Sequence, residues 1–97
     1  MTLRWTHLAS DHLRSAWELT AADNPAAADR VLERIMSAIE MLQIQPYIGR
    51  KGRVPGTREL VVSGTPFVLP YRLRRQAGEI EILAVLHGAR RWPQPSD

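Results

Sequence analysis

The 97-residue sequence contains no cysteine. This absence excludes disulfides, thiolate zinc sites and cysteine nucleophiles, and it fits a reducing compartment. No apolar run approaches the roughly 20 residues that a membrane span needs, because the longest covers only Ile82 to Leu86. The first residues also lack the apolar segment of a signal peptide. We therefore expect a cytoplasmic protein with no membrane partner.

Lysine is almost absent, since Lys51 is the single lysine among 13 cationic residues. The charges are unevenly distributed along the chain. Residues 1–48 hold four cationic and six acidic residues, a net charge of −2, whereas residues 49–97 hold nine and four, a net charge of +5. Guanidinium groups match carboxylates and phosphates, so the basic half suggests an anionic partner. A solvated surface is an equally good interpretation of the same charges.

The length and composition predict a single domain. Hydrophobic residues make up 44% of the chain and charged residues 24%, which is ordinary for a folded globular protein. A chain of 97 residues has room for one hydrophobic core only. We expect one domain over 1–97, with 94–97 as a loose tail.

The hydrophobic pattern of the first half predicts a short strand at 3–6 and two helices. Apolar residues recur every three or four positions through 7–22 and again, more regularly, from 25 to about 44. Asn24 can cap the second helix and Pro25 suits its first turn. The helix must end before Pro46. Two helices joined so closely predict an antiparallel hairpin.

The second half predicts a basic loop over 46–56 and three strands over 57–63, 67–75 and 79–86, separated by turns. Pro70 cannot donate a hydrogen bond to a neighbouring strand, so it indicates an edge strand or a bulge. The order β-αα-βββ predicts an α+β fold. In it, the helical hairpin packs on one face of a mainly antiparallel small sheet.

Common site motifs are missing. His7 and His12 lie on different faces of the predicted helix, and His87 has no partner at metal-ligand spacing, so we expect no metal. The stretch 49–53 is basic and glycine-rich, but it lacks the Gly-Lys-Ser/Thr ending and the following helix of a phosphate-binding loop. We expect no cofactor.

Basic residues are the remaining candidates for chemistry. They are Arg58, Arg72, Arg74, His87 and Arg90. If their strands are neighbours, these side chains converge at one end of the sheet. Guanidinium groups would there stabilise charge on a phosphorane, and His87 or Tyr71 would transfer a proton. Alternatively, Arg72 and Arg74 solvate an exposed sheet face and His87 caps the end of a strand.

Four stretches of the second half resemble the RelE/ParE superfamily, the toxins of type II toxin–antitoxin modules. They are 46–50, 55–62, 66–72 and 80–93. The likeness covers nearly the whole chain, because the helical hairpin also lies where this family has one, and the family tolerates a proline where this chain has Pro70. The resemblance implies a protein that arrests growth when free. It also implies a cognate antitoxin with an acidic, partly disordered tail, and a toxin–antitoxin hetero-oligomer.

The resemblance leaves two molecular targets open. RelE-like members cut mRNA on the ribosome, and that activity would give catalytic roles to Arg58, Arg72, His87 and Arg90. Such enzymes usually carry another arginine close to where this chain has Phe67, so Arg72 would have to substitute for it.

ParE-like members poison DNA gyrase and are not nucleases. The two-helix hairpin, the Pro-x-Ile-Gly phrase at 46–49 and the Leu86-His87 strand ending slightly favour this second group. A basic nucleic-acid-binding module without toxin activity is the third possibility.

Overall fold

In the computed structural model, the described residues are 1–88, so the predicted tail at 94–97 lies outside them. The elements are β1 (Thr2–Trp5), α1 (His7–Asp23), α2 (Pro25–Ile44), β2 (Arg50–Lys51), β3 (Arg58–Val61), β4 (Phe67–Arg74), β5 (Glu79–Ile82) and β6 (Leu86–His87). The predicted α+β fold is confirmed. Two short strands, β2 and β6, were not predicted as separate elements.

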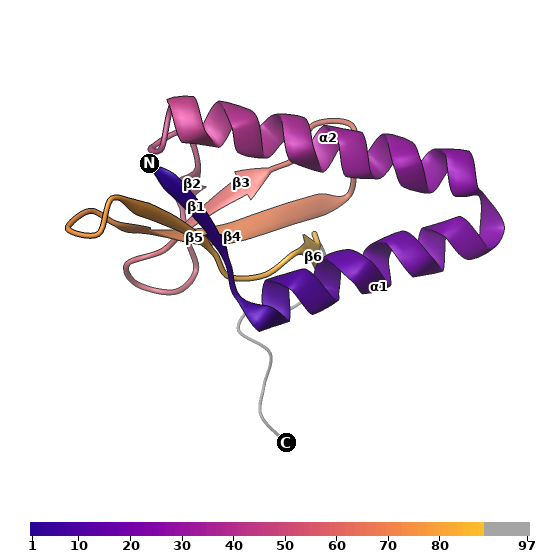
Figure 1. Cartoon of the computed structure of the whole chain (residues 1–97), viewed down its shortest axis with the longest axis horizontal. Coiled ribbons are helices and arrows are strands. Elements are labelled where there is room, and N and C mark those ends of the chain that lie inside the picture. The colour runs from indigo at the N-terminus through magenta and orange to yellow at the C-terminus, as the bar shows by residue number, and fades with distance from the viewer. Residues whose placement is uncertain (89–97) are drawn as a thin grey trace, which may run out of the picture.

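The two helices form the expected antiparallel hairpin; in Figure 1 they meet at their connection on the right and diverge toward the left. Asn24 caps α2 as predicted, because its side-chain oxygen accepts a hydrogen bond from the Ala27 N–H at 3.1 Å. Thr6 caps α1 in the same way through the Ala9 N–H. Trp17 of α1 is 40% exposed, and its indole N–H donates to the Asp29 carboxylate of α2. Neither helix within residues 1–88 is both long and apolar enough to cross a membrane.

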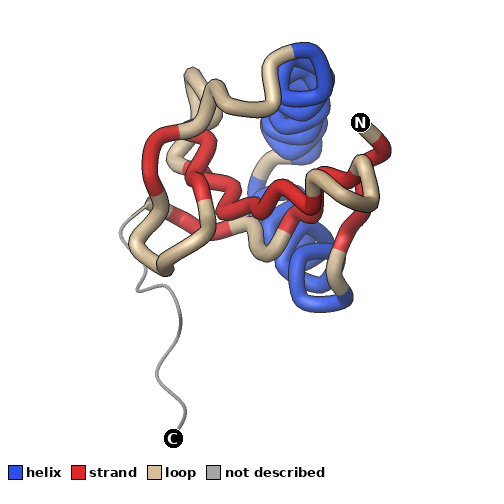
Figure 2. The backbone as a smooth tube through the Cα atoms, turned by 90° about the vertical axis from the view of Figure 1, so that its left-hand side faces the viewer, coloured by secondary structure: helices blue, strands red, loops and turns tan. Residues whose placement is uncertain are grey.

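The strands form one sheet in the order β1-β5-β4-β3-β2, with β6 paired to β4. Only β1 and β5 run parallel, so the sheet is mainly antiparallel, as predicted. One sheet face packs against the helices and forms the core, while the other is called here the outer face. Figure 2 shows the helices and strands end on. The core contains Ala9, Ile35, Ile39, Leu42, Leu60, Val62, Leu69, Tyr71, Ile80, Ile82 and Val85.

Pro70 lies in the middle of the sheet, so the expectation of an edge strand is wrong. It sits opposite Glu59 of β3, and its other side meets Leu83, directly after β5 ends. The Leu83 N–H donates to the Pro70 carbonyl at 2.9 Å. The return hydrogen bond, which proline cannot make, is replaced because the Thr6 hydroxyl donates to the Leu83 carbonyl at 3.1 Å.

The predicted strand over 79–86 is interrupted at 83–85. After Ile82 the chain leaves β4, and it rejoins the same strand as β6. The interruption is held by helix α1, since the Val85 N–H donates to His12 Nδ1 at 3.3 Å. The apolar run at 82–86 correctly predicted that this segment is buried. Nothing in the run predicted that the strand is interrupted at 83–85.

Candidate functional site

The outer face carries arginines that are paired with carboxylates. Arg72 and Arg74 share this face, as their spacing predicts, and their Nε atoms lie 3.8 and 3.5 Å from Glu81 Oε1 of β5. At the neighbouring edge, Arg4 lies 3.8 Å from Glu79. The interpretation of Arg72 and Arg74 as a charged sheet surface therefore fits the structure, and their charge is largely offset by Glu81.

A buried carboxylate organises the segment that was predicted as a basic loop. Glu59 is 2% exposed and accepts hydrogen bonds from the Arg50 guanidinium at 3.2 Å and from the Arg53 backbone N–H at 2.9 Å. The Arg53 Nε lies 3.3 Å away as well. Burial by itself would raise the pKa of Glu59, but these hydrogen bonds and positive charges outweigh it and lower that pKa below its usual value. Glu59 is therefore a carboxylate at neutral pH.

Tyr71 anchors the start of the same segment from inside the core. Its hydroxyl donates to the Pro46 carbonyl at 2.8 Å and accepts from the Gly49 N–H at 2.9 Å. The side chain is fully buried, and burial raises its pKa although Gly49 and Arg58 act in the opposite direction. A buried hydroxyl with both hydrogen bonds made inside the protein is poorly placed for the proton transfer considered for Tyr71.

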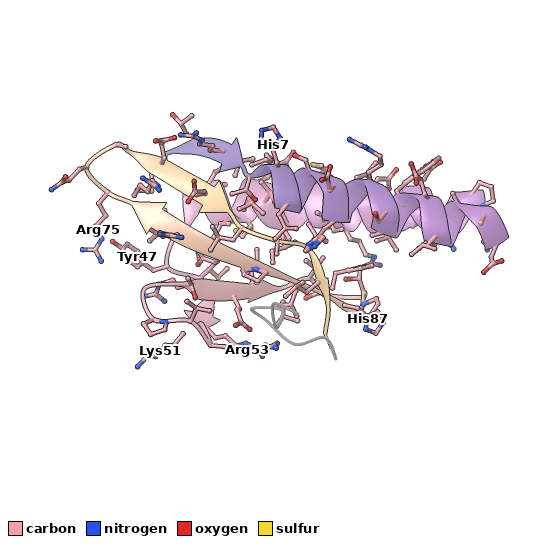
Figure 3. The ribbon with its side chains drawn as sticks, turned by 90° about the horizontal axis from the view of Figure 1, so that it is seen from below. His7, Tyr47, Lys51, Arg53, Arg75 and His87 are labelled. Atoms are coloured by element: carbon pink, nitrogen blue, oxygen red, sulfur yellow. The ribbon has the colours of Figure 1, made fainter. Side chains whose placement is uncertain are left out.

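A cationic and aromatic cluster lies at the end of the sheet beyond α2. Because α2 ends at Ile44, the helix does not cover Arg58 at the start of β3. The Arg58 guanidinium donates to the Gly49 carbonyl at 2.9 Å and to the Tyr47 carbonyl at 3.3 Å, and its carbon lies 5.1 Å from the centre of the Tyr47 ring. Arg75 lies 5.4 Å from the same ring, as cation–π contacts require. Tyr47 and Arg75 approach each other in Figure 3.

We call Tyr47, Lys51, Arg58 and Arg75 the Tyr47 cluster. They border a surface hollow of about 390 Å³, which Gly56, Thr57 and Leu73 complete. Among the described residues, none that lines the hollow is acidic. Within residues 1–88, none of the three cations forms an ion pair with a carboxylate. The cluster is therefore a concave surface with positive charge that the described part of the chain does not neutralise.

Among residues 1–88, the structure does not bring the predicted catalytic residues Arg58, Arg72 and His87 together. Arg58 pairs with Tyr71 on β4, whereas His87 pairs with Phe67, four positions away. At about 3.3 Å per residue, this separates the two positions by roughly 13 Å along β4. His87 lies at the opposite end from the Tyr47 cluster (Figure 3), while Arg72 lies on the outer face, and Arg90 falls outside the described residues.

Sequence reasoning singled out Arg58 but missed its three neighbours in the cluster. Tyr47 and Lys51 stood in the segment predicted as a loop, and Arg75 stood at the end of the strand predicted over 67–75. The pairing of β2 with β3 places Lys51 opposite Arg58. This pairing could not be predicted because β2 was not predicted from the sequence. Among residues 1–88, no three histidine or acidic side chains gather closely enough to hold a metal ion.

Comparison with known proteins places this geometry in a family. Residues 3–92 match the family described as the ParE toxin of the type II toxin–antitoxin system parDE. A protein of Sinorhizobium fredii described as "Putative toxin Y4kP" is 41% identical over 92 residues, which cover 95% of this chain and 93% of that protein.

Solved structures agree with this match. A chain from the chromosomal ParDE system of P. aeruginosa superposes with a TM-score of 0.79 and 29% identity, covering 90% of this chain and 95% of that one. The E. coli RelBE complex contains a chain with the same fold, at a TM-score of 0.61 and 12% identity over 93% of this chain and 98% of that one. Together with the match over residues 3–92, these likenesses show that the chain belongs to the ParE toxin family of type II toxin–antitoxin systems.

Proposed function

We propose that this toxin arrests growth by poisoning DNA gyrase and that it does not cut mRNA. The observation that carries the proposal is the dispersal of the residues that a nuclease would need. A proton-transfer group must lie within hydrogen-bond reach of the reacting atoms, beside the groups that stabilise the developing charge. Here His87 and Arg58 lie beside positions of β4 that are four residues apart, with roughly 13 Å between those positions along the strand.

Arg72 and Tyr71, the other candidates for a nuclease site, are also poorly placed for cleavage. Arg72 faces Glu81 on the outer face, so a carboxylate already offsets the charge that a scissile phosphate would need. Tyr71 is buried with its hydroxyl occupied. The ParE family match and the likeness to the P. aeruginosa ParDE chain also support a ParE-like activity, which the superfamily resemblance connects with gyrase.

The proposal includes a cognate antitoxin as the partner that silences the toxin in a cytoplasmic hetero-oligomer. The P. aeruginosa and E. coli chains that superpose on this one come from structures described as toxin–antitoxin systems or complexes. In this chain the residues from 49 onward carry a net charge of +5. This positive charge suits an antitoxin with an acidic tail that becomes ordered on binding.

A growth experiment tests the toxin role in cells. The chain is expressed alone from a tightly repressed promoter, and then together with the short gene adjacent to its own. We expect expression of the chain alone to stop growth and co-expression to restore it. Normal growth with abundant soluble, folded protein would contradict the toxin role.

Paired reactions with purified protein test the target. One contains gyrase, supercoiled DNA and ATP, and the other contains programmed ribosomes with a defined mRNA. We expect linear DNA after the gyrase reaction is stopped with denaturant, and an intact mRNA. Cleavage of the mRNA in the ribosomal A site, abolished by Arg90→Ala but not by Arg30→Ala on the exposed surface of α2, would select the ribonuclease instead.

A further inference from the structure

We propose that the Tyr47 cluster is a binding site for the phosphodiester backbone of a nucleic acid. The inference goes beyond the proposed function, because poisoning gyrase does not by itself require that the toxin touch DNA. It rests on four described residues from three separate segments that face one hollow of about 390 Å³. The binding test below contains no gyrase, so its failure can be distinguished from failure of the gyrase proposal.

The first argument is the fixed position of Arg58. Its guanidinium is held by the carbonyls of Gly49 and Tyr47, at 2.9 and 3.3 Å, and Gly49 is in turn held by the buried Tyr71 hydroxyl. Both hydrogen bonds use Nη1, so within residues 1–88 the Nε and Nη2 groups of Arg58 remain able to bind an anion. An arginine that is already ordered loses little conformational entropy when it binds a phosphate oxygen.

The second argument is charge. Lys51, Arg58 and Arg75 have no carboxylate partner within residues 1–88, although Arg50 and Arg53, from the same segment as Lys51, share the buried Glu59. Three cations around one hollow repel each other, and an anionic ligand relieves that repulsion. A chain of phosphates can engage several cations at successive positions along its length.

The third argument is the aromatic ring between the cations. Tyr47 is 52% exposed, although Arg58 and Arg75 both lie near its ring, and Leu73 adds an apolar patch to the hollow. Aromatic rings flanked by arginines bind sugars and bases while the guanidinium groups bind the phosphates. This mixture favours a nucleic-acid strand over an acidic peptide, which supplies carboxylates but no base or sugar to pack on Tyr47.

The test measures binding of a labelled single-stranded DNA of about 12 nucleotides by fluorescence anisotropy, across a salt series. Matched duplex DNA and RNA of the same sequence distinguish the forms of nucleic acid. The site variant is Lys51→Gln/Arg75→Gln. The control variant is Arg30→Gln/Arg72→Gln, which removes the same charge at exposed positions on α2 and the outer face. Unchanged circular dichroism confirms that both variants are folded.

We expect the site variant to lose at least about tenfold in affinity at 0.1 M salt, and the slope of log affinity against log salt to fall by about 0.7 for each cation removed. The control should stay within about twofold of the wild type. Equal losses in both variants, or no binding by the wild type, would overturn the proposal.

Two competitors identify the source of the anion. We expect a glutamate-rich peptide of equal charge to bind more weakly than the DNA. Tighter binding of that peptide, lost in the site variant, would assign the cluster to an acidic protein segment and overturn the proposal. Displacement of the DNA by inorganic phosphate at matched ionic strength would show a site for single phosphate groups and would also contradict it.

Discussion

The molecule has two basic regions of similar composition and different chemistry. On the outer face, Arg72 and Arg74 lie beside Glu81. In the Tyr47 cluster, Arg58 and Arg75 lie near an aromatic ring and no described carboxylate pairs with them. Arginines of the first kind make a stable charged surface, whereas those of the second kind stay available to an anionic partner. The sign and number of the charges do not distinguish the two regions, but their surroundings do.

The contrast is sharpest within the two residues of β2. Arg50 pairs with Glu59, while the next residue, Lys51, pairs with Arg58. Successive side chains of a strand point to opposite faces, so one neighbour meets a buried carboxylate and the other meets a second cation. A two-residue strand therefore divides one run of basic sequence between the two regions.

The largest expected effect comes from filling the space beneath the Tyr47 cluster. A Cβ at Gly49 would lie 2.6 Å from the Tyr71 hydroxyl oxygen, and the Tyr71 side chain is fully buried. We expect Gly49→Ala to lower the free energy of unfolding by about 3 kcal/mol and to weaken nucleic-acid binding. Chemical denaturation checks the stability. Gln45→Ala, an exposed position beside the same segment, should change it by less than about 0.5 kcal/mol, and an equal loss there would contradict the account.

The next largest effect is expected from removing the charge of Glu59, which pairs with two arginines. Glu59→Gln keeps the shape of the side chain but removes the charge that Arg50 and Arg53 share. We expect a loss of about 2 kcal/mol in the free energy of unfolding. The loss is substantial because Glu59 is buried, and it is limited because Arg50 and Arg53 keep contact with water. Glu79→Gln is the control, since among the described residues the Glu79 carboxylate forms an ion pair only with the exposed Arg4, at 3.8 Å, and the loss of stability should be close to zero. Equal effects would show that burial does not distinguish these carboxylates.

Lowering the pH should also reduce the stability of the protein through Glu59. The pKa of Glu59 is lowered in the folded protein, so its carboxylate contributes stability above its ordinary value of 4.5, and this contribution disappears as the pH falls through and below that value. We expect the difference in unfolding free energy between wild type and Glu59→Gln to shrink as the pH falls. Denaturation of both proteins across the acid range measures it. A constant difference at every pH would show that the Glu59 pKa is not lowered.

The smallest effect is expected on the outer face. Arg72 is half-exposed and shares Glu81 with Arg74, so Arg72→Gln leaves one arginine on the carboxylate. We expect the unfolding free energy to change by less than about 0.5 kcal/mol, measured by thermal denaturation. A loss of toxicity in this stable variant would place Arg72 in the functional surface and remove the distinction between the two regions.

The helices could be predicted from sequence because their information is local. Asn24 and Pro25 mark the start of α2, and its apolar repeat determines the buried face. Pro70 could not be placed correctly because its missing hydrogen bond is compensated by Thr6, which is distant in sequence. The Tyr47 cluster stayed hidden for the same reason, since it depends on where α2 ends and on the pairing of β2 with β3. Whether Arg58, Arg72, His87 and Arg90 act in catalysis stays a prediction.

The most direct measurement of the central claim is the gyrase reaction with three proteins: the wild type, Lys51→Gln/Arg75→Gln and Arg72→Gln. Each is incubated with gyrase, supercoiled DNA and ATP, and linear DNA is quantified after denaturant is added. The account predicts linear DNA with the wild type and with Arg72→Gln, and several-fold less with the double variant. Loss of linear DNA with Arg72→Gln but not with the double variant, or no linear DNA from the wild type, would contradict it.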